Sequence, residues 1–304
     1  MIEYSRQPVS IVQVDNRSIA NFVTDNKGNL DVKTVESFGD EWNRFSDFSE
    51  EDLTTAGSQY FDLLDDKIVN QNTIALDIGC GTGRWSKYMA RRVKFIEAID
   101  PSDAVYAAAK VLINYSNIRI TRAEVDSIPF TDNSFDFVFS LGVLHHIPDT
   151  AAAIRKAVEK LKPGGHLLLY LYYRFDNRSL VFKSIFFLSN ILRLFISKLP
   201  KKLKQWSCDV IATIIYIPLV SFARLIKMIS SGSHFYKKIP LSYYADKSFY
   251  IMRNDALDRF GTPLEQRFTR KEIDAMLTQC GMDDIRFSDN EPYWHVISRK
   301  KIIH

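Results

Sequence analysis

The chain has 304 residues, of which 46% are hydrophobic and 25% are charged, proportions typical of a soluble globular protein with an ample core. Its three cysteines, Cys80, Cys208 and Cys280, lie far apart and form no CxxC pair, so the sequence indicates neither a disulfide framework nor a zinc knuckle. The N-terminal MIEYSRQPVS has no basic segment followed by an apolar core, so we expect no signal peptide. We therefore predict a cytoplasmic protein.

The formal net charge of +4 is unevenly distributed along the chain. Between Asp176 and Lys247, twelve lysines and arginines stand against three aspartates, a local excess of nine positive charges. The remainder of the chain therefore carries five more negative than positive charges (4 − 9 = −5). A basic block inside an otherwise acidic chain predicts a separate structural unit with neighbours of its own.

Short apolar runs alternate with helical stretches from Thr73 to Tyr173. The predicted strands are residues 73–79, 94–100, 117–125, 134–143 and 166–173, and the predicted helices are 83–93, 102–114 and 148–165. This alternation implies parallel strand pairing with right-handed crossovers, hence an α/β, doubly wound, Rossmann-like sheet. A helix over 269–281 and a hairpin of strands over 283–289 and 293–301 follow at the C-terminal end.

The strand pattern breaks after the fifth predicted strand, and the chain there reads as helical. The predicted divisions are an N-terminal lead-in (1–36), an N-terminal helical lid (37–70), a core (71–173), a basic and apolar helical insertion (174–250) and a C-terminal completion of the core (251–304).

The insertion contains an amphipathic stretch and a longer apolar run. On a helical projection, one side of the first stretch holds Lys183, Asn190, Arg193 and Ser197, and the other holds Ile185, Leu188, Leu192, Phe195 and Leu199. Residues 210–223 carry no charge, but this run is shorter than a membrane span of about 20 residues and is interrupted by Pro218, so we predict no transmembrane segment. The insertion is then a cap whose apolar faces bury against each other and the sheet, or one that forms a pocket for a hydrophobic acceptor. In the second case its lysines draw the protein to anionic membrane surfaces or to an anionic substrate.

The segment ALDIGCGTGRW, residues 75–85, ends a strand in three alternating glycines. A dinucleotide fold expects its third glycine one position later, and a phosphate-binding P-loop expects a lysine that is missing here. Asp77 lies two positions before Gly79, where a carboxylate favours a cationic ligand such as a sulfonium with a free amino group. Asp100 ends the next strand, placed for two ribose hydroxyls, and Glu124 follows the third strand, placed for an adenine edge.

Four segments in this order resemble the class I S-adenosylmethionine-dependent methyltransferases: LDIGCGTG, EAID, AEVDSIPFTDNSFDFVFSLGVLHHIPD and LKPGGHLLLY. The resemblance is strongest to the ubiquinone/menaquinone-biosynthesis type and its natural-product relatives, and it covers about residues 40–173, with 265–301 matching by topology. It implies a seven-stranded methyltransferase sheet, S-adenosylmethionine as donor and S-adenosylhomocysteine as product. Two departures stand out: Glu124 replaces the usual aspartate, and the minimal fold has no counterpart of the insertion.

The resemblance and the spacing together give a set of candidate site residues. The cofactor-binding candidates are Asp77, Gly79, Cys80, Gly81, Thr82, Gly83, Asp100, Pro101, Glu124, Val125 and Leu141. The substrate candidates are His146, Tyr243, Tyr244, Asp255, Asp258, Arg259 and Trp294. His145 is the candidate catalytic residue, either as a general base or only as a packing residue of its loop, and His146 is expected to point the other way. Two adjacent histidines without a third ligand predict no metal site.

Ahead of the core, Phe38, Trp42, Phe45 and Phe48 recur at helical spacing and share one face. This face either docks on the core or closes as a lid over the bound donor, with Trp42 and Phe45 as the lid residues.

The sequence therefore favours methyl transfer to a small-molecule acceptor, hydrophobic or lipid-like, by in-line displacement. Two alternatives remain open: an aminopropyltransferase on the same fold, and a non-catalytic or membrane-associated cofactor-binding protein. We expect no nucleic-acid partner, because SLGV stands where an NPPY-like tetrapeptide would suggest base methylation. Peripheral contact with the membrane also remains open.

Overall fold

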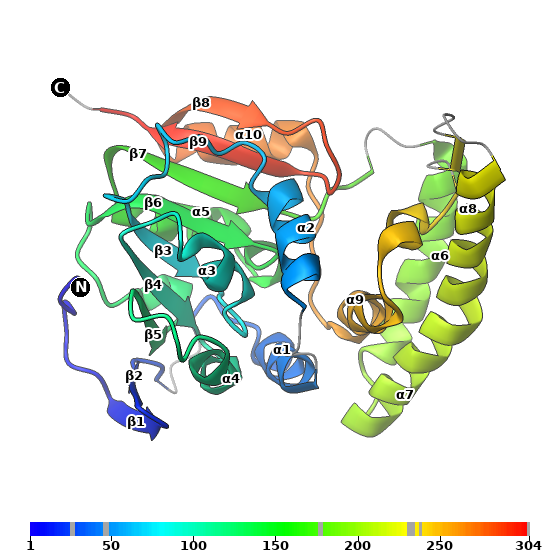
Figure 1. Cartoon of the computed structure of the whole chain (residues 1–304), viewed down its shortest axis with the longest axis horizontal. Helices are drawn as coiled ribbons and strands as arrows, with labels where there is room; N and C mark the ends of the chain where they lie inside the picture. The colour runs from blue at the N-terminus through cyan, green and yellow to red at the C-terminus, as the bar shows by residue number, and fades with distance from the viewer. Residues whose placement is uncertain (25–27, 45–48, 176–178, 230–234, 237–238, 303–304) are drawn as a thin grey trace. The chain divides into compact units, whose positions relative to one another are not determined.

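Figure 1 shows the computed structural model of the chain. The structure describes residues 1–302 except 25–27, 45–48, 176–178, 230–234 and 237–238, and it leaves the side chains of residues 40–44 and 181 undescribed. The chain divides into two compact units: unit 1 comprises Met1–Asn177 and Leu264–His304, and unit 2 comprises Arg178–Pro263.

Unit 1 is built on one mixed sheet in the order β1-β2-β5-β4-β3-β6-β7-β9-β8. Strands β3 to β7 run parallel, while β1 pairs antiparallel with β2, and β9 antiparallel with both β7 and β8. The strands are β1 (Ser10–Val14), β2 (Arg17–Asn21), β3 (Ile74–Ile78), β4 (Phe95–Asp100), β5 (Ile118–Arg122), β6 (Phe135–Leu141), β7 (Leu161–Tyr170), β8 (Met282–Phe287) and β9 (His295–Lys300).

Successive side chains of the central strands point to opposite faces of this sheet, so the hydrophobic core has two parts, one on each face. Leu76 and Val138 point to one face, which α5 and α10 cover, while Phe137 and Phe139 point to the other, which α3 and α4 cover. The helices of unit 1 are α1 (Val32–Arg44), α2 (Glu50–Tyr60), α3 (Arg84–Met89), α4 (Ala104–Val111), α5 (Thr150–Lys160) and α10 (Arg270–Gln279). Helix α10 begins at Thr269 with a capping box to Glu272.

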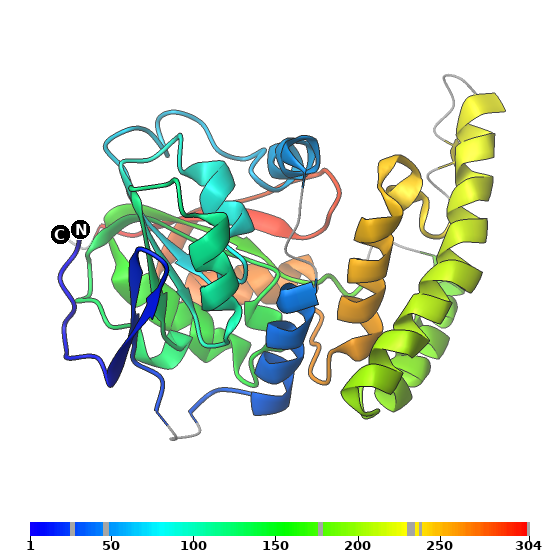
Figure 2. The same ribbon diagram turned by 60° about the horizontal axis from the view of Figure 1, so that its bottom comes forward.

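All seven predicted strands are present, but the sheet has nine strands rather than seven. The two additional strands lie in the predicted lead-in, where β1 and β2 form a hairpin, and β2 pairs parallel with the β5 edge (Figures 1 and 2). The hairpin is fixed because the Arg17 guanidinium donates to the carbonyls of Ile118 and Tyr115, both at 2.7 Å. Ile19 is buried beneath it.

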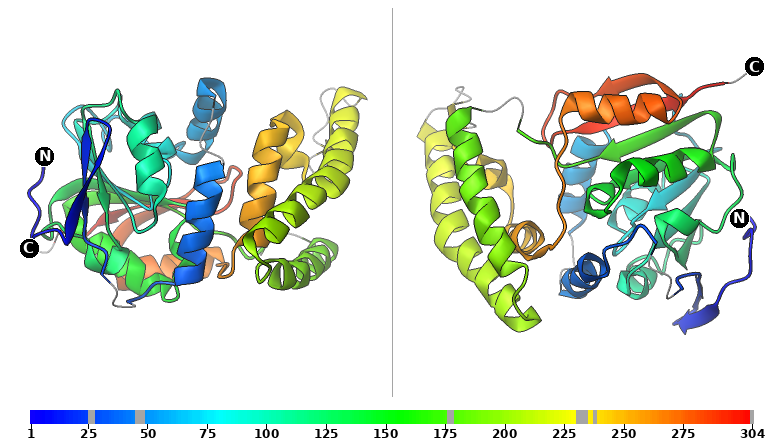
Figure 3. Two further views of the ribbon diagram at one scale, coloured as in Figure 1. Left: turned by 90° about the horizontal axis from the view of Figure 1, so that it is seen from below. Right: turned by 180° about the vertical axis from the view of Figure 1, so that it is seen from behind.

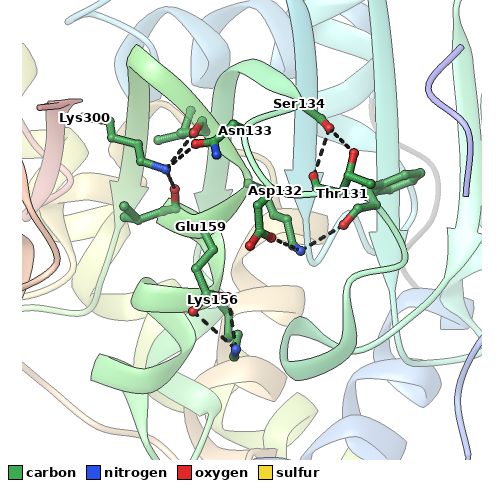
Figure 4. Close-up of polar contacts among 11 residues, drawn as sticks. Thr131, Asp132, Asn133, Ser134, Lys156, Glu159 and Lys300 are labelled. Atoms are coloured by element: carbon green, nitrogen blue, oxygen red, sulfur yellow. Dashed lines mark hydrogen bonds and ion pairs between the residues drawn. The ribbon is translucent and has the colours of Figure 1, made fainter. Parts of the chain in front are cut away.

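A polar network holds the edge of the sheet where β6 begins (Figure 4). Lys300 of β9 donates to Asn133 Oδ1 at 2.9 Å and to two backbone carbonyls near the end of α5. Lys160 contacts Asp132 Oδ1 at 2.6 Å. Lys160 and Lys300 therefore connect the loop before β6 to the C-terminal end of α5. The glycine turn lies at the opposite ends of the parallel strands, after the carboxyl end of β3.

Unit 2 is helical throughout its described residues. Its elements are α6 (Leu180–Ile196), α7 (Lys201–Ile211), a π-helical segment (Ala212–Tyr216), α8 (Ile217–Ile229), a 3-10 segment (Ser242–Asp246) and α9 (Phe249–Gly261). The sequence prediction ended the insertion near residue 250, and the unit continues through α9.

The prediction that Pro218 interrupts the apolar run is wrong. Residues Lys201–Ile229 form one continuous helix of 29 residues, in which the π-helical segment shifts the hydrogen-bond register just before the proline. By length and composition alone, this helix could cross a membrane, and it is the one such helix among the described residues. Within its most apolar 18-residue stretch, 28% of the residues are buried. The charge-free run of residues 210–223, which was used to exclude a transmembrane segment, therefore underestimates the length of this helix.

Candidate functional site

The glycine turn joins β3 to α3 at the carboxyl edge of the sheet. Gly79, Gly81 and Gly83 all have positive φ, at 78°, 53° and 81°. A Cβ on Gly79 would lie 2.4 Å from a methyl group of Val143, and one on Gly83 would lie 2.5 Å from a methyl group of Leu112. The turn therefore requires glycine for its conformation and, at two of the three positions, for close packing.

Asp77 lies one residue before the end of β3 and is almost completely buried. Its Oδ2 accepts a hydrogen bond from Ser86 Oγ at 2.7 Å. Burial, reinforced by the nearby carboxylate of Asp100, raises the pKa of Asp77 to about 7. A carboxyl group in this state gains its charge most readily when a cation binds beside it, which fits a ligand that carries an ammonium group.

Asp100 ends β4, the strand next to β3. Its Oδ1 accepts from Ser102 N at 2.8 Å and from Ser102 Oγ at 2.6 Å, and its Oδ2 accepts from Gly81 N at 3.0 Å. Burial raises the pKa of Asp100 although these donors oppose the shift. The carboxylate is therefore fixed in one orientation against the glycine turn, as a bidentate acceptor must be.

Glu124 follows β5 and lies next to a segment from the N-terminal part of the chain. Burial, with Asp126 adding to it, raises the pKa of Glu124. Asn29 N donates to Asp126 Oδ2 at 2.6 Å, and a Cβ on Gly28 would lie 3.7 Å from Glu124 Oε2. Residues 28–29, which belong to the predicted lead-in, thus contact the loop that was predicted to read adenine.

Helix α1 continues from this segment across the same edge. A Cβ on Gly39 would lie 3.8 Å from Ser102 Cβ, beside Asp100, and the Phe38 ring packs edge-on against the His146 ring with centroids 4.8 Å apart. The helix therefore contacts both the ribose-side loop and the histidine loop. Phe45 and the side chain of Trp42 lie outside the described residues, so the lid role stays a prediction.

His145 lies in a 3-10 turn, Leu144–His146, directly after β6, and is completely buried. Neither ring nitrogen has a hydrogen-bond partner in the described part of the chain, and the ring stacks on Tyr172 at 3.9 Å between centroids. Burial lowers the pKa of His145 well below its ordinary value, so the ring is neutral. A neutral imidazole can accept a proton, and its catalytic role stays a prediction.

The prediction that His146 points away from His145 is wrong, because the two ring centroids are only 4.0 Å apart. The Nδ1 atom of His146 lies 2.7 Å from the Leu264 carbonyl oxygen, which fixes the ring inside unit 1. The His146 ring is therefore packed between the rings of Phe38 and His145.

Sequence reasoning missed a row of aromatic side chains beside His145. Tyr172 contacts Tyr170 at 5.7 Å between ring centroids, Tyr170 contacts Tyr60 at 5.0 Å, and Tyr60 contacts Trp85 at 4.8 Å. We call these four residues the aromatic row. It leads from the histidine turn to the helix that leaves the glycine turn, and its only sequence signal was the run LYLYY at the end of the fifth predicted strand.

A second cluster lies at the start of β9, where the sequence had indicated His295 as a substrate candidate but not its pairing with Asp62. His295 is buried, with Nε2 at 2.7 Å from Asp62 Oδ1 and Nδ1 at 2.7 Å from the Pro292 carbonyl oxygen. Asp62 Oδ2 accepts from Ser288 Oγ at 2.6 Å and from Asn290 Nδ2 at 2.9 Å. The cluster joins the loop after α2 to the β8–β9 loop beside Tyr60, whose ring centroid is 6.4 Å from that of His295.

The remaining candidates fall into three groups. Cys80, Thr82, Val125 and Leu141 are buried in unit 1, and the Pro101 carbonyl accepts from Arg122 Nε at 3.0 Å. Trp294 is buried in the core on the α5 and α10 face, against Phe287 and Tyr173. Tyr243, Tyr244, Asp255, Asp258 and Arg259 belong to unit 2, so their role toward a substrate stays a prediction.

Residues 76–169 match the family model described as Methyltransferase domain. The chain is 33% identical over 111 residues to a ubiquinone biosynthesis O-methyltransferase of Marinobacter nauticus, covering 35% of this chain and 47% of that protein. It is 32% identical over 107 residues to a demethylmenaquinone methyltransferase of Staphylococcus aureus, covering 34% and 44%. It is also 33% identical over 102 residues to a tRNA U34 carboxymethyltransferase of Nautilia profundicola, covering 33% and 34%.

The match spans about half or less of the length of these curated relatives. Among solved structures, a SAM-dependent methyltransferase from Aquifex aeolicus aligns with 84% of this chain and 100% of its own, at 12% identity and a TM-score of 0.42, a similarity too low to support a functional argument. The family match covers β3 to β7, with the glycine turn, Asp100 and the histidine turn inside it. Residues 76–169 of this chain therefore match a methyltransferase domain and are similar to named methyltransferases.

Proposed function

We propose that the chain is an S-adenosylmethionine-dependent methyltransferase whose donor site is formed by Asp77, Gly79, Gly81, Asp100 and Glu124. The observation that carries this proposal is the pair of buried carboxyl groups, Asp77 and Asp100, on adjacent strands beside a glycine turn with positive φ. Two carboxyl groups in this position disfavour a phosphate and suit a ligand that combines a cation with sugar hydroxyls. When bound, the donor supplies an electrophilic methyl group.

The residues of the chain have distinct tasks in this proposal. Asp77 binds the ammonium group of the donor, Asp100 accepts from the two ribose hydroxyls, and Glu124 accepts from the adenine amino group. Helix α1 and residues 28–29 cover these loops and exclude water. Because the leaving group is neutral, alignment of the acceptor with the methyl carbon and the sulfur is the main catalytic task.

His145 takes part only if the acceptor loses a proton during the reaction. Its ring is neutral and its nitrogens have no hydrogen-bond partner in the described residues, so a bound acceptor hydroxyl or amine would be free to donate to it. The low pKa makes it a weak base, which suits an acceptor whose proton is already acidic. We propose this role for His145 and no catalytic role for His146.

We propose that the acceptor is a small hydrophobic molecule. The aromatic row supports this choice because it offers four rings beside the histidine turn, with the guanidinium groups of Arg84 and Arg267 over two of them. Two of the relatives are named for ubiquinone and menaquinone synthesis, while a third is named for a tRNA. We place this reaction in the cytoplasm.

Calorimetry with S-adenosylhomocysteine tests the donor site. Asp100→Asn should weaken binding by about 1–3 kcal/mol, because the amide accepts from the ribose less strongly than the carboxylate does. The control is Asp103→Asn, three residues away on an exposed carboxylate that contacts Arg122, and it should bind like the wild type. Wild-type affinity in Asp100→Asn would contradict the proposed site, and tighter binding of decarboxylated S-adenosylmethionine than of the intact donor would favour aminopropyl transfer instead.

A further inference from the structure

The second half of helix α6 is amphipathic in the reverse of the usual sense, whereas Lys183 in its first half is exposed. Arg193 is only 5% exposed and Ser197 is buried, whereas Phe195 is 70% exposed and Leu188 is 67% exposed. The large apolar side chains that α6 leaves exposed include Ile185, Phe187, Leu188, Ile191, Leu192 and Phe195. In a water-soluble domain the apolar side of a surface helix faces the core, so this helix presents the wrong side to water.

The long helix Lys201–Ile229 also leaves many large apolar side chains exposed, although its buried side is apolar as well. Cys208, Ala212 and Tyr216 are buried along one side of it. Its exposed apolar side chains include Trp206, Ile214, Phe222, Leu225, Met228 and Ile229. The helix is joined to α6 by the short turn at residues 197–200, and the two run in opposite directions (Figure 3).

Both helices turn their polar sides toward α9. Arg193 of α6 donates to the Thr262 carbonyl at 2.9 Å, and Arg259 of α9 donates to Ser189 Oγ at 3.1 Å. On the long helix, Asp209 forms a bidentate ion pair with Arg253 of α9, at 2.9 and 3.0 Å. The most exposed apolar side chains therefore lie on the sides directed away from α9, although the interior of the unit also holds apolar side chains such as Ala212, Val220 and Leu257.

The charges of unit 2 complement an anionic surface. The unit contains fourteen lysines and arginines against four aspartates, of which Asp209 pairs with Arg253 and Asp246 with Lys227. Exposed lysines, Lys198, Lys201 and Lys202, gather at the turn between the two apolar helices. Trp206, which is 63% exposed, follows one turn later. Lysine and tryptophan side chains next to an apolar side are typical of the boundary between headgroups and acyl chains.

We propose that unit 2 inserts the apolar sides of α6 and of the helix Lys201–Ile229 into the interface of an anionic lipid bilayer. The helices lie along the surface, because Arg193 and Asp209 bind them to the segment around α9, and a spanning arrangement would carry these polar contacts into the acyl chains. The lysines of the 197–202 turn contact anionic headgroups. This inference does not depend on the proposed methyl transfer.

Flotation of the full chain with vesicles tests it. Binding to vesicles of phosphatidylcholine with phosphatidylglycerol should exceed binding to phosphatidylcholine alone and should fall at high salt. The double variant Leu188→Glu/Phe195→Glu should bind at least tenfold less. The matched control is Val9→Glu/Ile11→Glu on the β1 edge of unit 1, where both side chains are also exposed, and it should bind like the wild type. The triple variant Lys198→Gln/Lys201→Gln/Lys202→Gln should lose on the order of 100-fold in binding to anionic vesicles only.

A second copy of the chain is the rival occupant of the apolar sides. Light scattering without lipid should give the same oligomeric state for the wild type and for Leu188→Glu/Phe195→Glu. A wild-type dimer that this variant separates into monomers, together with no binding to vesicles, would overturn the bilayer proposal. The circular dichroism of each variant must match that of the wild type, which is expected because the changed side chains are exposed.

Depth measurements separate a helix that lies on the bilayer from one that spans it. Trp206 and, in a Trp206→Phe background, Ile214→Trp report two positions along the exposed side of the long helix, after subtraction of the signal that the Trp206→Phe variant gives from Trp42, Trp85 and Trp294. For a helix lying in the interface, lipids brominated at shallow positions should quench both tryptophans most strongly. Deep quenching of the tryptophan at position 214 with shallow quenching of Trp206 would mean that the helix crosses the bilayer, and it would overturn the proposed orientation.

Discussion

The two units of this chain use apolar side chains in opposite ways. In unit 1, Phe137 and Phe139 are completely buried between the sheet and its helices. In unit 2, Arg193 is buried and Phe195 is exposed on the same helix. Helical periodicity reveals that a helix has two different sides, but it does not reveal which side meets water. That choice depends on the solvent, and unit 2 has the polarity expected for contact with lipid.

The largest expected effect concerns the burial of a phenylalanine side chain within each unit. Phe139→Ala should lower the unfolding free energy of unit 1 by about 3–5 kcal/mol, because it removes a buried ring and leaves a cavity. Phe195→Ala should change stability by no more than about 0.5 kcal/mol, since its ring lies in solvent. Denaturant titration of both variants measures the contrast, and a cost for Phe195→Ala near that of Phe139→Ala would mean that its ring is buried in solution.

The next effect concerns the buried charge of unit 2. Arg193→Met should destabilise unit 2 by about 1.5–3 kcal/mol, because the Thr262 and Pro263 carbonyls lose a charged donor. The exposed Lys198 supplies the comparison, and Lys198→Met should change stability by no more than about 0.5 kcal/mol. Hydrogen exchange of the α6 and α9 amides reports the change locally. Equal exchange rates in the two variants would contradict the claim that the hydrogen bonds of Arg193 stabilise the packing of α6 and α9.

A smaller effect is expected from the buried acid of unit 1. The folded pKa of Asp77, about 7, lies above its ordinary value of 3.8, so folding favours the protonated form. The free chain should therefore lose stability as the pH rises from about 4 to about 7, and a bound ammonium group should oppose that loss. The affinity for S-adenosylhomocysteine should rise with pH over this range, by at most about tenfold per unit for one group.

Asp77→Asn isolates this titration from that of Asp100. In this variant the pH dependence of binding should flatten, while affinity at pH 8 should be weaker than in the wild type. Affinity measured by calorimetry from pH 5.5 to 8 checks both parts. An unchanged slope in Asp77→Asn would assign the titration to another group.

Much of unit 1 was predictable from the sequence because its signals are local. The run TIALDIG and the glycines after it fix β3 and the turn that follows, and Asp100 ends β4 where the pattern placed it. The β1–β2 hairpin was missed because most of its positions are exposed or half-buried, which gives no continuous apolar run, and because β2 is held by pairing with β5.

The parts that sequence reasoning missed depend on contacts between distant segments. His295 and Asp62 are separated by 233 positions, and the aromatic row joins α2, α3 and β7. The 29-residue helix was underestimated because Pro218 is ordinarily a helix breaker, whereas a π-helical segment accommodates it here. Charge-free length alone was therefore a poor guide to the extent of this helix.

If unit 1 binds the methyl donor and unit 2 binds a bilayer, as proposed, the methyl acceptor should be found in lipid. The direct measurement is transfer of a radiolabelled methyl group from S-adenosylmethionine to a total lipid extract presented in anionic vesicles, followed by partition between organic solvent and water. We predict label in the organic phase, reduced at least tenfold in both Asp100→Asn and Leu188→Glu/Phe195→Glu. Label confined to a polar metabolite or to RNA, at a rate that vesicles do not change, would contradict the account.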